Sequence, residues 1–310
     1  PSEMPASYPM DALKAHAVCA RSYAYRHILG NGYREYGAHV DDSTYYQVYN
    51  NINEQKTTTQ AVQETYGKVA FWQEQAIQAY YYSTGWGVSE DVEIWGTNQQ
   101  ENYDYLRVKE LAQGGSREGE PDYSSEEMFR TRFDDPDAVQ ANAAEGGQKG
   151  PDYDSAYPWY RWKTSVTAEQ LADTLNRKLP EFLERYPEQI RIEKEGGDEE
   201  NMFGDRVSSI EIVKRLKGGS VDEVILRGDG VAVYAQGQLP VRNLLGSAEL
   251  TYERNDGSES DMTSFPSTFF YVDTEEDTEG NKSFTFQGGG FGHGVGLSQN
   301  GAAAMAETGM

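Results

Sequence analysis

The sequence is poor in the residues that most often bind metals or form covalent cross-links. It contains one cysteine, Cys19, and four histidines. A single cysteine excludes an intrachain disulfide and disfavours a structural zinc site, which needs several thiolate ligands. His16 and His27 fall on one predicted helix, but they lack the four-residue spacing of a zinc-protease ligand pair. We therefore expect no metal and no cofactor.

Positive charge and long apolar runs are also scarce. The chain has 27 Lys and Arg against 51 Asp and Glu, which gives a formal net charge of −24. Such a surface repels phosphate backbones, so nucleic acid is not an expected partner. The sequence contains no run of about 18 apolar residues and no signal peptide. Its abrupt start at Pro1 and its end at Met310 predict a piece of a longer protein, so the lack of an anchor excludes nothing.

The chain does have enough apolar material for a core. Of its 310 residues, 37% are hydrophobic and 12% are aromatic, which is typical of a globular protein with two domains of ordinary size. We predict an α+β protein with a long N-terminal helix and an antiparallel, β-rich second domain. Residues 1–98 with 240–310 form the expected catalytic domain. Residues 99–240 form the inserted second domain, with an irregular acidic excursion at 110–155, and a cleft is expected between the domains.

Hydrophobic spacing and turn residues predict the secondary structure. Residues 9–29 are expected to form a helix, because Pro9 suits a first turn and Gly30 follows its end. Its predicted buried stripe is Met10, Leu13, Ala17, Ala20 and Ala24. The other expected elements are a strand at 45–49, a short helix at 57–66, two β segments within 67–85, a helix capped by Thr167, antiparallel strands within 190–238, acidic loops at 251–262 and 273–282, and a last strand at 283–290.

The N-terminal region holds the first candidate reactive groups. Glu3 precedes the long helix in "SEMPASYP" and is either a general acid at a cleft edge or one solvated acid among 51. Lys14 and Arg21 are two helical turns apart and share a face. That face suits an anionic ligand or, alternatively, is an ordinary amphipathic surface. Cys19 lies among Ala and Val, which favours a small packed residue over a nucleophile.

The chain closes with a glycine-rich motif around a histidine, "QGGGFGHGVGLSQNGAAAMA". Glycines lack a Cβ, so their backbone N–H groups can approach a bound group closely, with His293 among them. A phosphate-binding loop is the alternative interpretation. No lysine and no GKS/T sequence follows, which disfavours nucleotide binding. An Ala-rich helix is expected after the motif.

The two terminal motifs resemble the signatures of the stage II sporulation protein D family, also called the amidase-enhancer family. "PSEMPASYPMDALKAHAVCARSYAY" is similar to its opening motif, and "GGGFGHGVGLSQNGAAAMAETG" is similar to its closing motif. Between them, "DDSTYYQVY", "TYGKVAFWQEQAIQAYYYSTGWG" and "EIWG" follow the family order. Relatives with a zinc site hold it with Cys and His near "QVY". Neither residue occurs in "STYYQVY", so the resemblance adds no metal here.

The resemblance implies a lytic transglycosylase that cleaves the glycan strands of peptidoglycan after their peptides are removed. It implies partnership with an amidase and other engulfment proteins in sporulation. It also implies an extracytoplasmic location, with the full-length protein anchored in the membrane or secreted. Glu3 matches the family's catalytic acid. The residues expected to bind substrate are Lys14, Arg21, Gln47, Tyr49, His293, Ser298 and Gln299, with stacking aromatics expected among Tyr23, Tyr49, Tyr81, Trp159, Tyr160 and Trp162.

One carboxyl group is enough for this reaction. It protonates the bridging oxygen and then accepts the proton of the C6 hydroxyl of N-acetylmuramic acid, which closes a 1,6-anhydro ring. Hydrolysis usually needs two carboxylates. A general acid must hold its proton, so we expect a partly desolvated Glu3. Two alternatives stay open: a non-catalytic, glycan-binding enhancer of an amidase, and a hydrolase with a second carboxylate near Glu3.

Overall fold

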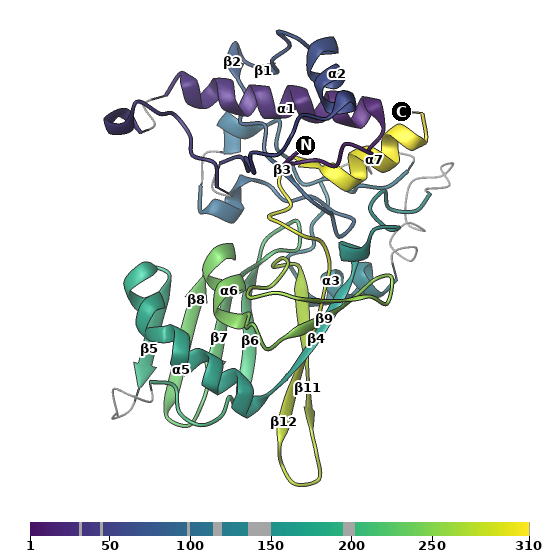
Figure 1. The fold of residues 1–310 in the computed structure, drawn as a ribbon. Helices are drawn as coiled ribbons and strands as arrows, with labels where there is room; N and C mark the ends of the chain where they lie inside the picture. Colours follow the sequence, from purple (N-terminus) through teal and green to yellow (C-terminus); the bar gives the residue numbers. More distant parts are fainter. Residues whose placement is uncertain are drawn as a thin grey trace. The chain divides into compact units, whose positions relative to one another are not determined.

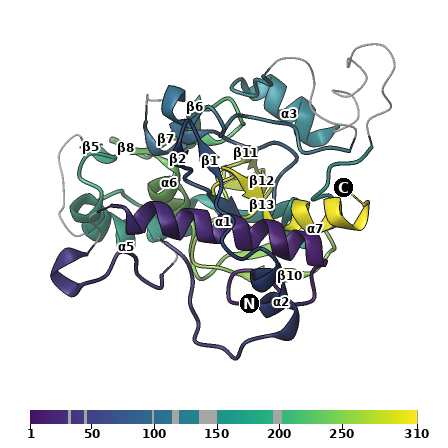
Figure 2. The same cartoon turned by 90° about the horizontal axis from the view of Figure 1, so that it is seen from above.

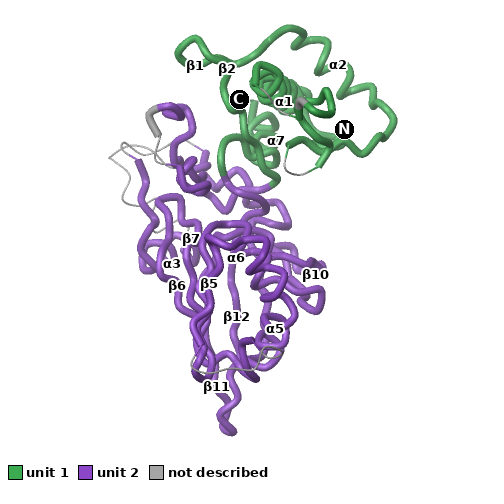
Figure 3. The backbone as a smooth tube through the Cα atoms, turned by 90° about the vertical axis from the view of Figure 1, so that its left-hand side faces the viewer, with its two compact units in different colours: residues 1–83, 295–310 green, residues 84–294 purple. Residues whose placement is uncertain are grey.

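The computed structural model describes residues 1–30, 33–43, 46–97, 100–113, 120–135, 150–194 and 202–309. The chain forms two compact units (Figure 3): residues 1–83 with 295–310 are unit 1, and residues 84–294 are unit 2. Helices together with largely antiparallel sheets confirm the predicted α+β class. The unit boundaries differ from those predicted at 98/99 and 240. The division into compact units does not show which unit is catalytic. The catalytic domain and the cleft therefore remain predictions.

Unit 1 is built on the predicted long helix, α1 (Met10–Ile28), which follows Pro9. The Ala-rich helix α7 (Gln299–Glu307) lies alongside α1 (Figures 1 and 2), and α2 (Lys56–Glu64) also packs against it. The predicted stripe is correct only in part, because α1 is contacted by α2, α7 and a strand rather than by one surface. The side chains that α1 buries are Ala12, Leu13, His16, Ser22 and Tyr23.

A short hairpin and a parallel strand pair complete unit 1. Strands β1 (Phe71–Trp72) and β2 (Gln75–Ala76) form the hairpin. Its turn residues Gln73 and Glu74 both have positive φ, at 46° and 64°, which is the backbone of a type I′ turn. The two β segments predicted within 67–85 are therefore confirmed.

The parallel pair joins the two chain segments of unit 1, residues 1–83 and 295–310. Strand β13 (Leu297–Ser298) pairs with β3 (Tyr81–Tyr82). By contrast, the strand predicted at 45–49 is wrong for its described residues 46–49, which form no ladder. There the backbone N–H of Val48 donates to the Glu3 carboxylate instead of to a neighbouring strand.

Unit 2 contains two antiparallel sheets, as expected of the β-rich region. The five-stranded sheet has the order β10-β9-β4-β12-β11, and the four-stranded sheet has the order β5-β8-β7-β6. Their strands are β4 (Trp162–Thr167), β5 (Ile190–Lys194), β6 (Ser209–Arg215), β7 (Val221–Arg227), β8 (Val231–Gln236), β9 (Thr251–Arg254), β10 (Glu259–Asp261), β11 (Phe270–Glu276) and β12 (Lys282–Gly288).

We predict loops for the acidic segments of unit 2, and this prediction is correct only in part. Residues 251–262 contain β9 and β10, and residues 273–276 belong to β11, whereas residues 277–281 form the turn between β11 and β12. Strands β10 and β11 are the two edges of the five-stranded sheet. Charged side chains are tolerated on edge strands, where they discourage pairing with other chains. High acidity therefore did not exclude β structure here.

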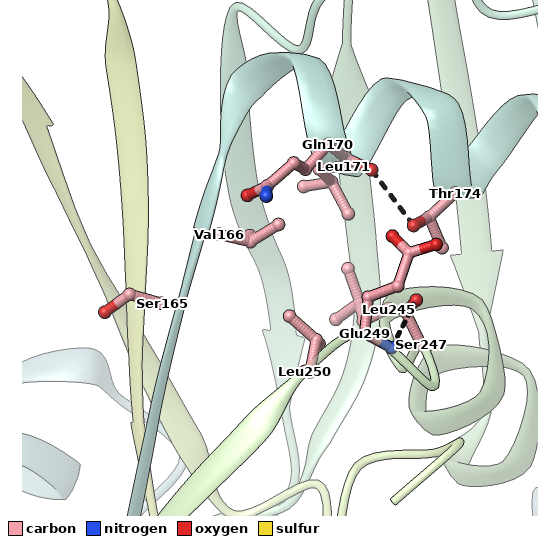
Figure 4. Close-up of a pocket in the computed structure, with 9 residues that line it drawn as sticks. All are labelled: Ser165, Val166, Gln170, Leu171, Thr174, Leu245, Ser247, Glu249 and Leu250. Carbon is pink, nitrogen blue, oxygen red and sulfur yellow. Dashed lines mark hydrogen bonds between the residues drawn. The ribbon is translucent and has the colours of Figure 1, made fainter. Parts of the chain in front are cut away.

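The main core of unit 2 lies under α5 (Ala168–Arg185) and α6 (Gln238–Leu245). The predicted cap of α5 is confirmed: Thr167 Oγ1 accepts from the Gln170 N–H at 3.2 Å, and the Gln170 side chain accepts from the Thr167 N–H at 3.1 Å. Such a capping box stabilises a helix by about 1 kcal/mol. A cavity of about 90 Å³ lies between α5, β4 and the segment after α6 (Figure 4). It is too small for a sugar, since ligand pockets measure about 300–1,000 Å³.

The excursion predicted at 110–155 is partly ordered. Residues Glu126–Asp134 form helix α3, and Phe129 of this helix is fully buried against Trp86 in a second aromatic core. Arg132 of α3 and Asp152 form a buried ion pair at 2.6 Å. The excursion is therefore not irregular at these residues. Its remaining parts at 114–119 and 136–149 lie outside the described residues.

Candidate active site around Glu3

The Glu3 carboxylate is half-buried in unit 1, as expected for a partly desolvated acid. One oxygen accepts from the Val48 N–H, and the carboxylate is also hydrogen-bonded to the Tyr81 hydroxyl. Burial raises the pKa of Glu3, while these two hydrogen bonds act in the opposite direction. The result is a carboxyl group that is oriented by two donors and holds its proton more tightly than an exposed glutamate does.

Tyr81 is itself held in place by two neighbours. Its hydroxyl oxygen accepts from the Gln47 amide at 3.2 Å, and the same amide donates to the Ala20 carbonyl on α1 at 3.1 Å. The His16 ring meets Tyr81 edge-on, with ring centroids 4.6 Å apart. Gln47, which the sequence placed among substrate-binding residues, is thus a neighbour of the tyrosine that contacts Glu3.

The closing motif reaches the same place from the other end of the chain. Gln299 Nε2 donates to the Glu3 backbone carbonyl at 2.9 Å and lies 3.2 Å from His16 Nε2. Burial lowers the pKa of His16 to about 4, so its ring is neutral at pH 7 and its Nε2 accepts the Gln299 proton. A hydrogen bond from the Tyr8 hydroxyl to Asn300 adds a second tie. The sequence missed His16 and Tyr81 as parts of this network.

An open pocket of about 620 Å³ exposes the Glu3 carboxylate. This volume lies in the range of ligand sites, about 300–1,000 Å³. The pocket is formed by the start of the chain, α1 and residues 40–42 and 47–49, and its lining residues are Glu3, Ala20, Val40, Asp41, Asp42, Gln47, Val48 and Tyr49. The sequence reasoning missed Asp41 and Asp42, although the repeated acid immediately precedes the segment that carries Gln47 and Tyr49.

The two cations predicted beside Glu3 are engaged elsewhere in unit 1. Lys14 Nζ pairs with Glu64 of α2 at 2.5 Å. The Arg21 guanidinium donates to the carbonyls of Thr65 at 2.8 Å and Lys68 at 2.9 Å, at the end of α2. Neither cation is among the described residues that line the Glu3 pocket. They share a face as predicted, and that face holds α2; their role in substrate binding stays a prediction.

In the glycine-rich motif, the backbone N–H groups of residues 289–292 bond to the protein itself, so these four are not free to bind a ligand. Between 289 and 292, four successive backbone N–H groups donate to carbonyls of the chain itself, those of Phe269, Trp159, Thr84 and Pro266. Gly288 also lies so close to Trp162 that a Cβ would stand 2.1 Å from its ring. The glycines therefore serve close packing.

The polar residues of the closing motif have distinct environments. His293 is half-buried in unit 2, with its ring centroid 5.3 Å from that of Trp95. Ser298 is buried and caps α7 by accepting from the Gly301 N–H at 3.1 Å. Their expected contacts with substrate stay predictions. Cys19 is no nucleophile in this environment, since burial raises the pKa of its thiol to about 11.

Three of the six aromatics considered for sugar stacking are core residues. Tyr23, Tyr160 and Trp162 are buried, which removes them as stacking surfaces. Tyr49 is different, because 64% of it is exposed and it lines the Glu3 pocket. Among the aromatics proposed, Tyr49 thus combines an open ring with a position next to the candidate acid.

Within the described ranges, no group of three or more His, Cys, Asp or Glu side chains is arranged to hold a metal ion. Over the same ranges, no helix combines the length and apolar character that crossing a bilayer requires. The candidate site itself is a carboxyl group with its hydrogen-bond partners at an open pocket. Such an arrangement is suited to acid–base chemistry on an uncharged bond.

Comparison with known proteins agrees with the motifs. Residues 1–72, which hold Glu3 and most of its pocket, match the family described as Stage II sporulation protein. Residues 147–296 match a domain of unknown function, DUF8618. Together with the relatives below, these matches support the resemblance to the stage II sporulation protein D and amidase-enhancer family.

Among the individual relatives, the Amidase enhancer of Bacillus subtilis is 25% identical over 316 aligned residues, which cover 100% of this chain and 37% of the relative. Stage II sporulation protein D of Bacillus subtilis is 35% identical over 111 residues, covering 31% of this chain and 32% of the relative. An uncharacterized protein of Brachyspira hyodysenteriae is 38% identical over 94 residues, covering 30% of this chain and 25% of the relative. The chain thus spans about a third of the length of these proteins.

Proposed function

We propose that this chain is a peptidoglycan lytic transglycosylase whose general acid is Glu3. The observation that carries the proposal is the half-buried Glu3 carboxyl group, with its raised pKa, at a pocket of about 620 Å³. An acid must hold its proton and be accessible to its substrate. Burial of Glu3, which raises its pKa, supports the first requirement, and its position on the pocket supports the second.

The proposed reaction uses the same carboxyl group twice. Glu3 first donates its proton to the oxygen that links N-acetylmuramic acid to the next N-acetylglucosamine, and the C1–O bond breaks with its electron pair on that oxygen. The Glu3 carboxylate then accepts the proton of the C6 hydroxyl, whose oxygen closes the 1,6-anhydro ring at C1. The hydrogen bonds from Val48 and Tyr81 orient the carboxyl group and favour its ionised form between the two steps.

The proposed substrate is the glycan strand of peptidoglycan after removal of its peptides, and the setting is engulfment in sporulation. Support comes from the family match and from the relative named Stage II sporulation protein D. The proposed location is extracytoplasmic, with the full-length protein anchored or secreted. An amidase and other engulfment proteins are the proposed partners. Tyr49, exposed at the pocket, is the proposed stacking surface for one sugar ring.

A second candidate function is a non-catalytic enhancer that binds glycan and stimulates an amidase. The observation in its favour is that the relative named Amidase enhancer aligns with 100% of this chain. The same pocket serves this function, but Glu3 would then act only as a binding group.

Mass spectrometry of digested, peptide-free glycan separates the candidates. A lytic transglycosylase produces anhydro-muramyl ends that Glu3→Gln abolishes. No cleavage by the wild type, together with stimulation of an amidase that Glu3→Gln leaves intact, establishes the enhancer and contradicts the proposal.

A further inference from the structure

Asp41 and Asp42 place two further carboxylates on the pocket that Glu3 lines, and of these Asp42 is exposed whereas Asp41 is held by hydrogen bonds. Glu3 and Asp41 come from different segments, since Glu3 precedes α1 and Asp41 lies in the segment that follows it. Asp41 is only half-buried, so part of its surface is open to the pocket that it lines. A sugar bound in the pocket would meet carboxyl groups from both segments.

Asp41 is surrounded by hydrogen-bond donors. Its Oδ1 accepts from the Ser43 N–H at 2.9 Å and from the Ser43 hydroxyl at 2.6 Å, and its Oδ2 accepts from the Tyr33 hydroxyl at 3.0 Å. The Ser43 contacts form a local turn of the kind that Asp favours. These hydrogen bonds lower the pKa of Asp41, whereas burial raises that of Glu3. Two carboxyl groups whose environments push their pKa values apart are suited to different tasks at one site.

We propose that Asp41 is a second catalytic group, whose fixed negative charge stabilises the cationic sugar formed when Glu3 protonates the glycosidic bond. The inference rests on the proposed function and deepens it. Asp41 forms no bond to the sugar and takes no proton. The positive charge that develops at C1 as the C1–O bond breaks is offset by the carboxylate until the C6 oxygen attacks C1 and its proton passes to Glu3.

The same contacts argue against Asp41 as the base of a hydrolase. A base that activates water must accept a proton, but three donors already bind the Asp41 carboxylate and favour its ionised form. An anion of low basicity is suited to electrostatic stabilisation. The reaction then still ends in the anhydro ring rather than in a reducing end.

The test compares Asp41→Asn with wild type on peptide-free glycan strands, with products identified by mass spectrometry. We expect kcat to fall about 10²-fold, as for loss of one preorganised electrostatic group, with KM nearly unchanged and anhydro-muramyl ends still the product. Asp41→Glu keeps the charge and is expected to retain more activity than Asp41→Asn. Sodium formate is expected to restore part of the rate of Asp41→Ala, because a small anion can replace the missing carboxylate.

Asp256 offers a matched control in unit 2. It is exposed, and its carboxylate accepts from the Ser258 N–H at 3.1 Å and from the Ser258 hydroxyl, as Asp41 does from Ser43. Asp256→Asn removes one charge from the same kind of turn and is expected to leave kcat unchanged. A similar loss in both variants would show that net charge, not the position of Asp41, matters, and would overturn the inference.

The remaining outcomes are also decisive. A wild-type rate in Asp41→Asn overturns the role of Asp41 and leaves the transglycosylase intact, whereas no anhydro-muramyl ends from the wild type overturns both. Reducing ends from the wild type that disappear in Asp41→Asn assign Asp41 to water activation and contradict the stabilising role. Unfolding of both Asp41→Asn and Asp41→Ala, measured by circular dichroism, makes Asp41 a structural residue and likewise overturns the inference.

Discussion

Glu3 in unit 1 and Glu90 in unit 2 are two glutamates whose pKa is raised by the same cause, burial. Glu90 is only 1% exposed, and it accepts from three backbone N–H groups: Asp91 at 3.1 Å, Gly218 at 3.0 Å and Ser220 at 3.2 Å. Glu3 has a protein donor on one side and an open pocket on the other. Burial raises the pKa of both glutamates, but only Glu3 lies on an open pocket, whereas Glu90 is enclosed by the protein.

The comparison teaches that a perturbed pKa does not by itself mark a catalytic group. Glu90 connects the segment after β3 to the turn between β6 and β7. A Cβ on Gly218 would lie 2.7 Å from the Glu90 carboxyl carbon, so the backbone closes tightly over this group. Glu90 is thus a structural acid, whereas Glu3 lines an open pocket.

The largest expected effect separates the two glutamates by activity. Glu3→Gln keeps the size of the side chain but removes the transferable proton, so glycan cleavage should fall by about 10³-fold or more. Glu90→Gln should cleave at the wild-type rate at a temperature where it is folded. Anhydro-muramyl ends counted by mass spectrometry measure both. A comparable loss in folded Glu90→Gln would break the comparison.

The next effect separates them by stability. Glu90→Gln places an amide NH₂ among backbone N–H donors, so the free energy of unfolding should fall by about 1–3 kcal/mol. Burial raises the pKa of Glu90 from 4.5 to about 8, so the folded state binds more protons than the unfolded state between these values. The stability of the wild type should therefore decrease as pH rises from about 4.5 to about 8, and Glu90→Gln should weaken this slope. Thermal unfolding across that range measures it, and an unchanged slope would contradict the assignment.

A third experiment tests whether Arg21 stabilises the folded protein, as we infer for Glu90, or binds substrate, as we propose for the Glu3 pocket. Arg21→Ala removes the donors to the α2 carbonyls and should cost about 2 kcal/mol of unfolding free energy, with binding to peptide-free glycan nearly unchanged. Calorimetry and a glycan pull-down report the two quantities. Loss of binding at unchanged stability would instead support the predicted contact with substrate.

The smallest effect concerns the donor that tunes Glu3. The Tyr81 hydroxyl lowers the pKa of Glu3 against the larger effect of burial. Tyr81→Phe should therefore raise that pKa further, and the fall of kcat/KM at high pH, where the acid form is lost, should move upward by about one pH unit or less. A pH–rate profile of both proteins checks this. A shift to lower pH would show that Tyr81 does not stabilise the ionised Glu3.

Local sequence patterns predicted the helices whose ends and composition depend on neighbouring residues alone. Pro9 and the alanines specified α1, and Thr167 with Gln170 specified α5. The errors occurred where tertiary contacts override local preference. The acids at 273–276 were compatible with an edge strand, and the 46–49 segment gave a backbone N–H to Glu3 instead of to a ladder.

For the candidate site, the motif resemblance named Glu3 and Gln299, which the structure brings together, and the desolvation argument predicted a half-buried Glu3. Asp41, His16 and Tyr81 could not be recognised, because nothing local distinguishes them from other acids, helix residues and tyrosines. Their importance arises from long-range contacts, such as the His16–Gln299 approach at 3.2 Å. The glycine-rich motif was misread because sequence does not reveal whether bare backbone faces a ligand or the protein's own carbonyls.

The tie between Gln299 and the Glu3 carbonyl joins residues 296 positions apart. At about 5–20 residues per second, the ribosome makes the second partner on the order of 15–60 s after the first. A polypeptide that has not yet reached residue 299 therefore lacks this hydrogen bond to Glu3. Tertiary contacts that join such distant residues form late, and the hydrogen-bond network around Glu3 is complete only after the closing motif has been synthesised.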